Sequence, residues 1–203
     1  MRLLDLSLSA AGLVALSPAL LVIALAVKCS SPGPIFYRAR RVGKNGQLFT
    51  LYKFRTMVAD AAARGPGITG CGDPRITRVG RWLRATKLDE LPQLLNTLKG
   101  EMSFIGPRPE DPRYVELYST DQRRVLEVRP GITGAATLLH RHEERLLTGP
   151  DWEAMYRDEI LPAKLQIELD YLSRRTLPKD LWILVQTVLA LFRPSRQLDA
   201  HRG

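Results

Sequence analysis

Two adjacent acidic residues, Asp89 and Glu90, are the first candidates for chemistry in this sequence. Pro92, which a helix tolerates only in its first turn, follows them, and Gly100 is typical of a helix end. The sequence therefore predicts a helix that begins at or just before Asp89. At such an N-terminus the free N–H groups and the helix dipole favour ionised carboxylates and lower their pKa. Ionised carboxylates suit a hard cation such as Mg²⁺, but acids in a first turn are also common caps.

A second candidate is Arg108, which stands between Pro107 and Pro109. The prolines stiffen the turn, so the arginine loses little conformational freedom when it binds. Its planar guanidinium matches a phosphate or a carboxylate. A carboxylate pair that can hold a metal ion and a rigid arginine that can bind phosphate are groups that phosphoryl transfer requires.

The bulk composition is that of a folded protein with an anionic partner. The 203 residues carry a formal net charge of +9, which suits nucleic acid, an anionic lipid surface or a phosphorylated substrate. No nucleic-acid motif is found, so we expect no nucleic-acid partner. Cys29 and Cys71 lie far apart without metal-ligand spacing, which is typical of reduced thiols in a cytosolic setting.

The N-terminal region is apolar and carries no charge over residues 6–27. As a helix this run would reach roughly 33 Å, about one bilayer core. Basic residues flank both of its ends, Arg2 before it and Lys28 after it, which favours both ends on the cytoplasmic face. Ser17 and Pro18 break the helix near its middle, and the serine can bond a freed carbonyl. The residues therefore fit a re-entrant, monotopic helix, which we hypothesise, and a spanning helix equally well, and a cleaved signal peptide less well.

The region after the apolar run reads as a mixture of strands and helices. Residues 35–42 and 47–54 alternate as two strands, joined by a turn with the hairpin signal Asn45-Gly46. Period-two alternation places Lys53 on one face of the second strand, where a solvated position is the simple alternative. A short amphipathic helix is predicted at 76–84. The apolar run at 181–192 is too short to span a bilayer and predicts an interfacial or buried helix.

The predicted fold class is α+β: a mostly helical monotopic membrane protein with a small β-hairpin. We expect a re-entrant membrane helix over residues 1–30, a cytoplasmic catalytic domain over 31–194 and a loose tail over 195–203. The glycines of residues 65–70 spell G-x-G-x-x-G, but no buried strand precedes them, so a flexible loop is predicted instead of a dinucleotide site.

With these motifs in one order, the sequence resembles the small monotopic phosphoglycosyl transferases of the bacterial sugar transferase family. The resemblance covers nearly the whole chain. The matching segments are Ser17-Pro18, residues 53–57, Arg84 with residues 88–93, residues 102–109, residues 129–134 and residues 169–171.

The resemblance implies transfer of a sugar-1-phosphate from a UDP-sugar to polyprenol (undecaprenyl) phosphate, the first membrane step of bacterial glycan assembly. Asp89 would attack the β-phosphate, release UMP and carry the phosphosugar covalently. Glu90 would assist by positioning groups or exchanging protons. Mg²⁺ would be held by Asp89 and the diphosphate.

The resemblance also assigns substrate contacts and a location. Arg108, Arg84 and Lys53 would balance phosphate charge, and Asp170 would handle the incoming polyprenol phosphate. The re-entrant helix would hold the site at the cytoplasmic face of the bacterial cytoplasmic membrane, in contact with membrane lipids. The alternatives are a non-catalytic basic membrane-surface protein and a transferase that uses direct attack; the sequence names neither the sugar nor the oligomeric state.

Overall fold

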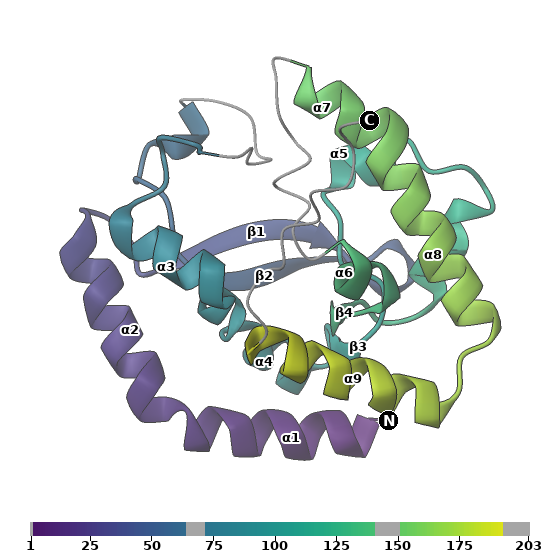
Figure 1. Ribbon diagram of the computed structural model, residues 1–203, viewed down its shortest axis with the longest axis horizontal. Coiled ribbons are helices and arrows are strands. Elements are labelled where there is room, and N and C mark those ends of the chain that lie inside the picture. Colours follow the sequence, from purple (N-terminus) through teal and green to yellow (C-terminus); the bar gives the residue numbers. More distant parts are fainter. Residues whose placement is uncertain (1, 64–71, 141–150, 193–203) are drawn as a thin grey trace, which may run out of the picture.

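A computed structural model describes residues 2–63, 72–140 and 151–192. The predicted loose tail at 195–203 and the glycine motif at 65–70 lie outside these residues. The described chain is mostly helical with small sheets, so the α+β class is confirmed (Figure 1). Its α-helices are α1 (Arg2–Ala15), α2 (Ser17–Ser30), α3 (Arg78–Thr86), α4 (Gln93–Lys99), α5 (Pro112–Val115), α6 (Ala135–Leu139), α7 (Trp152–Met155), α8 (Leu161–Ser173) and α9 (Leu177–Phe192). Its strands are β1 (Phe36–Val42), β2 (Leu48–Phe54), β3 (Ser103–Ile105) and β4 (Gly131–Thr133).

The predicted hairpin is confirmed within one residue at each end. Strands β1 and β2 pair antiparallel, from Phe36 opposite Phe54 to Val42 opposite Leu48. The connecting turn needs positive φ, and Asn45 supplies it with φ 56°. The hairpin is therefore set by its own sequence and presents Lys53 from β2.

A second, parallel pair of strands was not predicted. Strands β3 and β4 pair through Ser103 opposite Gly131 and Ile105 opposite Thr133. The backbones approach so closely that a Cβ on Gly131 would lie 2.2 Å from the nitrogen of Gly106. Only glycine fits there, which explains why the glycines of the two motifs face each other.

The N-terminal apolar run forms two helices joined at a bend of 64°. Pro18 cannot donate to the carbonyl of Val14, and the Ser17 hydroxyl donates to that carbonyl instead at 2.8 Å. The predicted break is therefore confirmed, with its physical cause. Within the described residues no single helix has the length and apolarity to cross a membrane, whereas the bent pair α1 and α2 meets that test together by length and composition.

The bent pair runs along one edge of the molecule and packs against it (Figure 1). Ile23 and Val27 of α2 join a core cluster with Phe54 of β2 and Leu83 of α3. Arg55 closes this contact, because its guanidinium donates to the carbonyls of residues just past α2. Helix α2 is therefore part of the core of the fold.

Helix α1 is held by charged contacts at its first turns. Arg2 donates to the carbonyl oxygens of Thr97 and Leu98 at the end of α4. Asp5 is buried and accepts hydrogen bonds from the Ser103 hydroxyl and the Phe104 amide. An otherwise apolar helix thus holds the start of β3.

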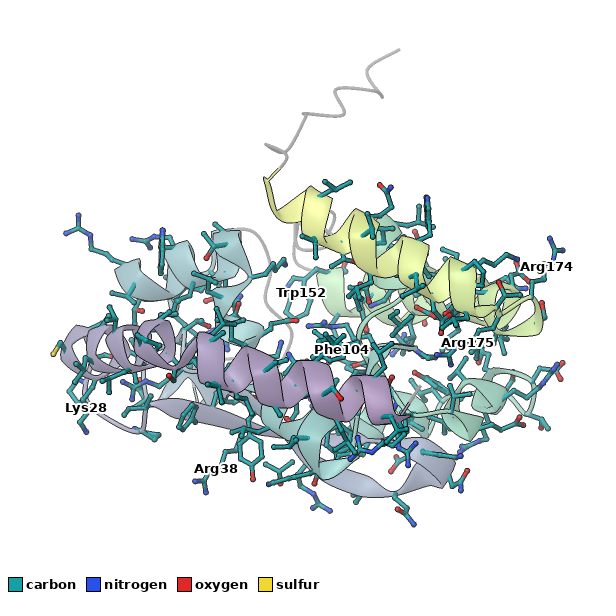
Figure 2. All side chains as sticks on the ribbon, turned by 90° about the horizontal axis from the view of Figure 1, so that it is seen from below. Lys28, Arg38, Phe104, Trp152, Arg174 and Arg175 are labelled. Carbon is teal, nitrogen blue, oxygen red and sulfur yellow. The ribbon has the colours of Figure 1, made fainter. Side chains whose placement is uncertain are left out.

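Helix α9 covers the other side of the small parallel sheet. The hydroxyls of Thr187 in α9 and Thr133 in β4 lie 2.8 Å apart, and Arg175 donates to the carbonyl of Ile105. Figure 2 shows Phe104 between α1 and α9. Helix α9 leaves several large apolar side chains exposed: Leu177, Leu181, Trp182, Val185, Val188 and Leu189.

Candidate active site

Three residues that the sequence singled out meet in one ion cluster. Lys53 of β2 donates to Glu90 Oε1 at 2.9 Å, and Arg108 donates to the same oxygen at 2.5 Å and to Oε2 at 3.3 Å. The three side chains come from positions far apart in the chain. The structure thus brings together the hairpin, the acidic pair and the proline-flanked arginine.

Backbone hydrogen bonds that continue beyond strands β3 and β4 fix the position of Arg108. Beyond β3 the amide of Gly106 donates to the carbonyl of Thr133, and the amide of Gly131 donates to the carbonyl of Pro107. The ladder therefore extends to the residue directly before Arg108. This agrees with the prediction of a stiff turn that presents the guanidinium.

The predicted helix at the acidic pair is wrong in its start. Leu88–Glu90 forms a 3₁₀ turn, Pro92 is the N-cap of α4, and the helix begins at Gln93. The proline ends the 3₁₀ turn before the α-helix starts, so the two acids precede its first turn. Gly100 closes α4 with φ 87°, as predicted. The dipole of α4 therefore cannot be the main reason for the ionisation of this pair.

Burial and neighbouring cations set the two carboxylates apart. Burial opposes ionisation of Glu90, but Arg108 and Lys53 outweigh it and hold the pKa of Glu90 well below its usual range. For Asp89 burial dominates and raises the pKa, although the positive charges of Lys53 and Arg84 counteract it. The expectation of two lowered pKa values is therefore wrong for Asp89. The two cations hold Glu90 in its ionised form. The negative charge of Asp89 is balanced less completely by neighbouring cations.

Asp89 has a free oxygen directed into the protein. The residue is 7% exposed, and its Oδ1 is buried without a hydrogen-bond partner among the residues that the structure describes. Arg84 stands near enough to lower the pKa of Asp89, while its Nε donates to the Thr56 hydroxyl at 3.0 Å. A buried, unpartnered carboxylate oxygen is costly, which is typical of a position reserved for a ligand or a reaction.

The donor set of the pair fits a hard cation only in part. Over residues 2–63, 72–140 and 151–192 no group of three or more His, Cys, Asp and Glu side chains is placed to hold a metal ion. The free oxygen of Asp89 is the kind of ligand that Mg²⁺ prefers, and Mg²⁺ usually takes its other ligands from water and substrate phosphates. The residues present therefore fit a metal that arrives with a diphosphate.

The ion cluster lines a cavity of about 660 Å³. Lys53, Glu90 and Arg108 all contribute to its wall, and the turn at Lys87 and Leu88 forms part of its rim. Asp89 is buried and does not itself line the cavity, although its neighbours Leu88 and Glu90 do. The volume falls within the range of about 300–1,000 Å³ that is usual for ligand sites.

The predicted contact Asp170 lies apart from this cluster. It is exposed on α8, accepts a hydrogen bond from Gln166 at 2.9 Å and does not line the cavity. The acid two positions earlier, Glu168, is 3% exposed instead. Its Oε1 accepts from the amide of Ala136 at 2.9 Å, and burial raises its pKa to about 7.

Glu168 belongs to a polar group that the sequence analysis missed. Lys164 donates to the Tyr156 hydroxyl, which donates to Glu110 Oε2 at 2.5 Å. A second cavity of about 30 Å³, enough for a water molecule, is lined by Arg108, Glu110, Lys164 and Glu168. The sequence does carry one signal for this group: Lys164 and Glu168 are four residues apart, a spacing that places two side chains on one helix face.

Comparisons with known proteins identify the family of the chain. The family model described as "Bacterial sugar transferase" matches residues 1–194. The chain belongs to the bacterial sugar transferase family. It is therefore an enzyme, as predicted, and the non-catalytic alternative is not supported.

Curated members of the sugar transferase family align over most of the chain. A UDP-glucose:undecaprenyl-phosphate glucose-1-phosphate transferase of Caulobacter vibrioides is 38% identical over 94% of this chain and 68% of its own length. The exopolysaccharide production protein PSS of Rhizobium leguminosarum bv. phaseoli is 38% identical over 93% of both chains. An undecaprenyl-phosphate glucose phosphotransferase of Komagataeibacter xylinus is 37% identical over 92% of this chain but only 35% of its own length. The chain thus spans about a third of some relatives and nearly all of others.

Proposed function

We propose that this protein transfers a sugar-1-phosphate from a UDP-sugar to polyprenol phosphate, by way of a phosphosugar carried on Asp89. The observation that carries the proposal is the unequal state of the acidic pair. Glu90 is neutralised by Lys53 and Arg108, whereas Asp89 keeps a buried oxygen without a partner. The names of the relatives support the substrate classes, since two of them include undecaprenyl phosphate and glucose phosphate transfer.

The reaction divides into two displacements at one phosphorus atom. An Asp89 oxygen bonds to the β-phosphorus while the bond from that phosphorus to the bridging oxygen breaks, and UMP leaves with the bridging oxygen. A phosphate oxygen of the lipid then attacks the same phosphorus and breaks the aspartyl bond, which restores the carboxylate of Asp89. Arg108 and Lys53 stabilise the negative charge that develops on the phosphoryl oxygens.

Donor binding brings Asp89 to the cavity. Leu88 and Glu90, the residues on either side of Asp89, line the cavity, so a small change in this turn would bring the carboxylate to the donor. A diphosphate bound to Arg108 would weaken that residue's contact with Glu90. Glu90 is then free to orient the diphosphate or to exchange a proton.

Mg²⁺ is part of the proposal, with Asp89 as its protein ligand. Bound there together with the diphosphate, it would neutralise phosphate charge and favour the ionised form of Asp89. Arg84 supports the same ionisation through its nearby charge.

We further propose that α1 and α2 form a re-entrant hairpin at the cytoplasmic face of the bacterial cytoplasmic membrane. The bend of 64° and the Ser17 contact with Val14 support it, since a bent helix can enter and leave by one face. The packing of α2 on Phe54 and Leu83 supports it as well, because it holds the helix against the catalytic domain.

Mass spectrometry tests the nucleophile directly. The intact protein, mixed with a panel of UDP-sugars and Mg²⁺ but no lipid, is expected to gain one sugar-phosphate on Asp89. Asp89→Asn should abolish both the adduct and transfer, while Asp158→Asn, which changes an exposed aspartate, should leave both unchanged. Transfer that survives in Asp89→Asn would refute the assignment of Asp89. Transfer without any adduct in the unaltered protein would favour direct attack.

A further inference from the structure

The large cavity has two chemically different parts. Its polar part holds the cluster of Lys53, Glu90 and Arg108. The other part is walled mainly by apolar side chains of α1, α4 and α9, by Leu16 just after α1, and by Phe104, which lies between α1 and α9 in Figure 2. These side chains are Leu8, Leu16, Leu94, Phe104, Leu184 and Val188. Gln93 of α4 and Thr187 of α9 are the polar neighbours of these side chains in the lining.

The apolar part opens at the surface between α1 and α9. Leu8, Leu16 and Val188 line the cavity and are nevertheless 42%, 36% and 47% exposed. Other apolar side chains of the same two helices are exposed as well, among them Val14 of α1 and Trp182 of α9. A path with apolar walls thus leads from the surface of these two helices to the ion cluster.

A glycine contributes to the floor of this path. Gly12 lines the cavity in the middle of α1, and a Cβ there would lie 3.3 Å from a methyl carbon of Leu94. Glycine inside a helix costs about 1 kcal/mol relative to alanine. The close approach of α1 to Leu94 of α4 is a structural reason for that cost.

We propose that this apolar part binds the isoprenoid chain of the lipid phosphate acceptor, with the chain leaving between α1 and α9. The inference rests on the proposed function and adds the place of the acceptor. The path is continuous with Lys53 and Arg108, where the acceptor phosphate must arrive, and its walls match a hydrocarbon chain. A UDP-sugar is polar along its length and would leave its groups unsatisfied against these walls.

Tryptophan substitutions on the wall of the path test the proposal. Leu8→Trp and Val188→Trp would fill the path from α1 and from α9. Leu4→Trp and Val185→Trp are matched controls, because these residues lie on the same helices, are 40% and 54% exposed and do not line the cavity. Each control carries the same added ring to a position outside the path.

The readout compares a long and a short acceptor. Undecaprenyl phosphate in phosphatidylcholine nanodiscs and dimethylallyl phosphate in solution are each offered with a UDP-sugar that supports turnover. For the path-filling variants we expect kcat/KM to fall about tenfold or more with undecaprenyl phosphate and to change little with dimethylallyl phosphate, since only the long chain needs the apolar contact. An equal loss with both acceptors, or an equal loss in the control variants, would overturn the proposal.

Photocrosslinking of the unaltered protein tests the same path without relying on the folding of a variant. A polyprenyl phosphate with a diazirine on an isoprene unit near the phosphate is expected to label α1 and α9 peptides, and excess undecaprenyl phosphate should suppress that labelling. Labelling confined to other peptides, or labelling that undecaprenyl phosphate does not displace, would overturn the proposal. Failure of the proposed function looks different: no UDP-sugar would then support transfer to either acceptor, while the crosslink would still report whether the path binds the chain.

Discussion

The carboxylate of Asp5 in α1 accepts hydrogen bonds from the hydroxyl of Ser103, at 3.0 Å to each oxygen, across 98 positions of the chain. The same carboxylate accepts from the amide of Phe104 at 3.1 Å. Strand β3 leads within three residues to Arg108, so the helix proposed to enter the membrane holds the strand that positions a cation of the candidate active site.

Replacing Asp5 should therefore affect both stability and transfer. Asp5→Ala leaves the Ser103 hydroxyl and the Phe104 amide without their acceptor, at a cost of about 2–4 kcal/mol in the free energy of unfolding. We expect Asp5→Asn to cost less, because its amide oxygen still accepts one bond. Ser9→Ala is the control, since Ser9 is equally buried on the same helix and its hydroxyl has no partner among the described residues. Denaturant unfolding in detergent measures the difference, and equal losses in Asp5→Ala and Ser9→Ala would contradict this role.

The bend between α1 and α2 gives a second prediction. Pro18→Ala restores an amide that can donate to the carbonyl of Val14, so we expect the bend to decrease and transfer to fall. An N-terminal cysteine tag should react with a membrane-impermeant reagent only from the cytoplasmic side in the unaltered protein. If the straightened variant spans the membrane, the tag becomes reactive from outside. A tag that is already outside in the unaltered protein would refute the re-entrant hairpin.

The buried carboxyl of Glu168 predicts a pH dependence of stability. Its pKa is raised by burial from 4.5 to about 7, despite the opposing charges of Lys164 and Arg175. Between these values the folded state binds more protons than the unfolded state, so stability falls as pH rises from about 4.5 to 7, by up to about 3 kcal/mol. Above pH 7 this contribution is constant.

Glu168→Gln should remove that loss, because an amide oxygen still accepts from Ala136 and carries no charge. We expect the variant to gain stability relative to the unaltered protein at pH 8 and to differ little at pH 5. Asp170→Asn, on the exposed side of the same helix, should leave the difference between the two pH values unchanged. Free energies of unfolding measured at both pH values test this prediction. A pH dependence that persists in Glu168→Gln would contradict the assignment of the effect to Glu168.

Local signals in the sequence were sufficient for the hairpin, the helix break and the turn at Arg108. Pro18 and the prolines beside Arg108 restrict the backbone, and Asn45 tolerates the positive φ that its turn needs, so in each case a local residue determines the result. The parallel pair β3 and β4 could not be predicted, because its strands of three residues are paired across some 28 positions. The raised pKa of Asp89 could not be predicted either. Burial by elements that are distant in the sequence raises it, whereas the local sequence suggested a helix terminus that would lower it.

The cluster of Glu90 with two cations gives the last prediction. Glu90→Gln leaves Lys53 and Arg108 facing each other without their carboxylate. Burial already lowers the pKa of Lys53 and Glu90 counteracts it, so the substitution should lower that pKa further. We expect kcat to fall about a hundredfold, because the cations are no longer held in place for the phosphoryl oxygens.

A double-mutant cycle separates this coupling from a general loss of stability. Lys53→Met and Glu90→Gln should each destabilise the fold, and the double variant by about 1–3 kcal/mol less than their sum, because the pair is largely buried. The same cycle on the exposed pair of Arg157 and Asp158 should show no coupling beyond error, since solvent screens it. Additive losses at Lys53 and Glu90 would mean that the two charges do not act as a unit. The lowered kcat of Glu90→Gln should not recover in the double variant, because Lys53 also serves the phosphoryl group.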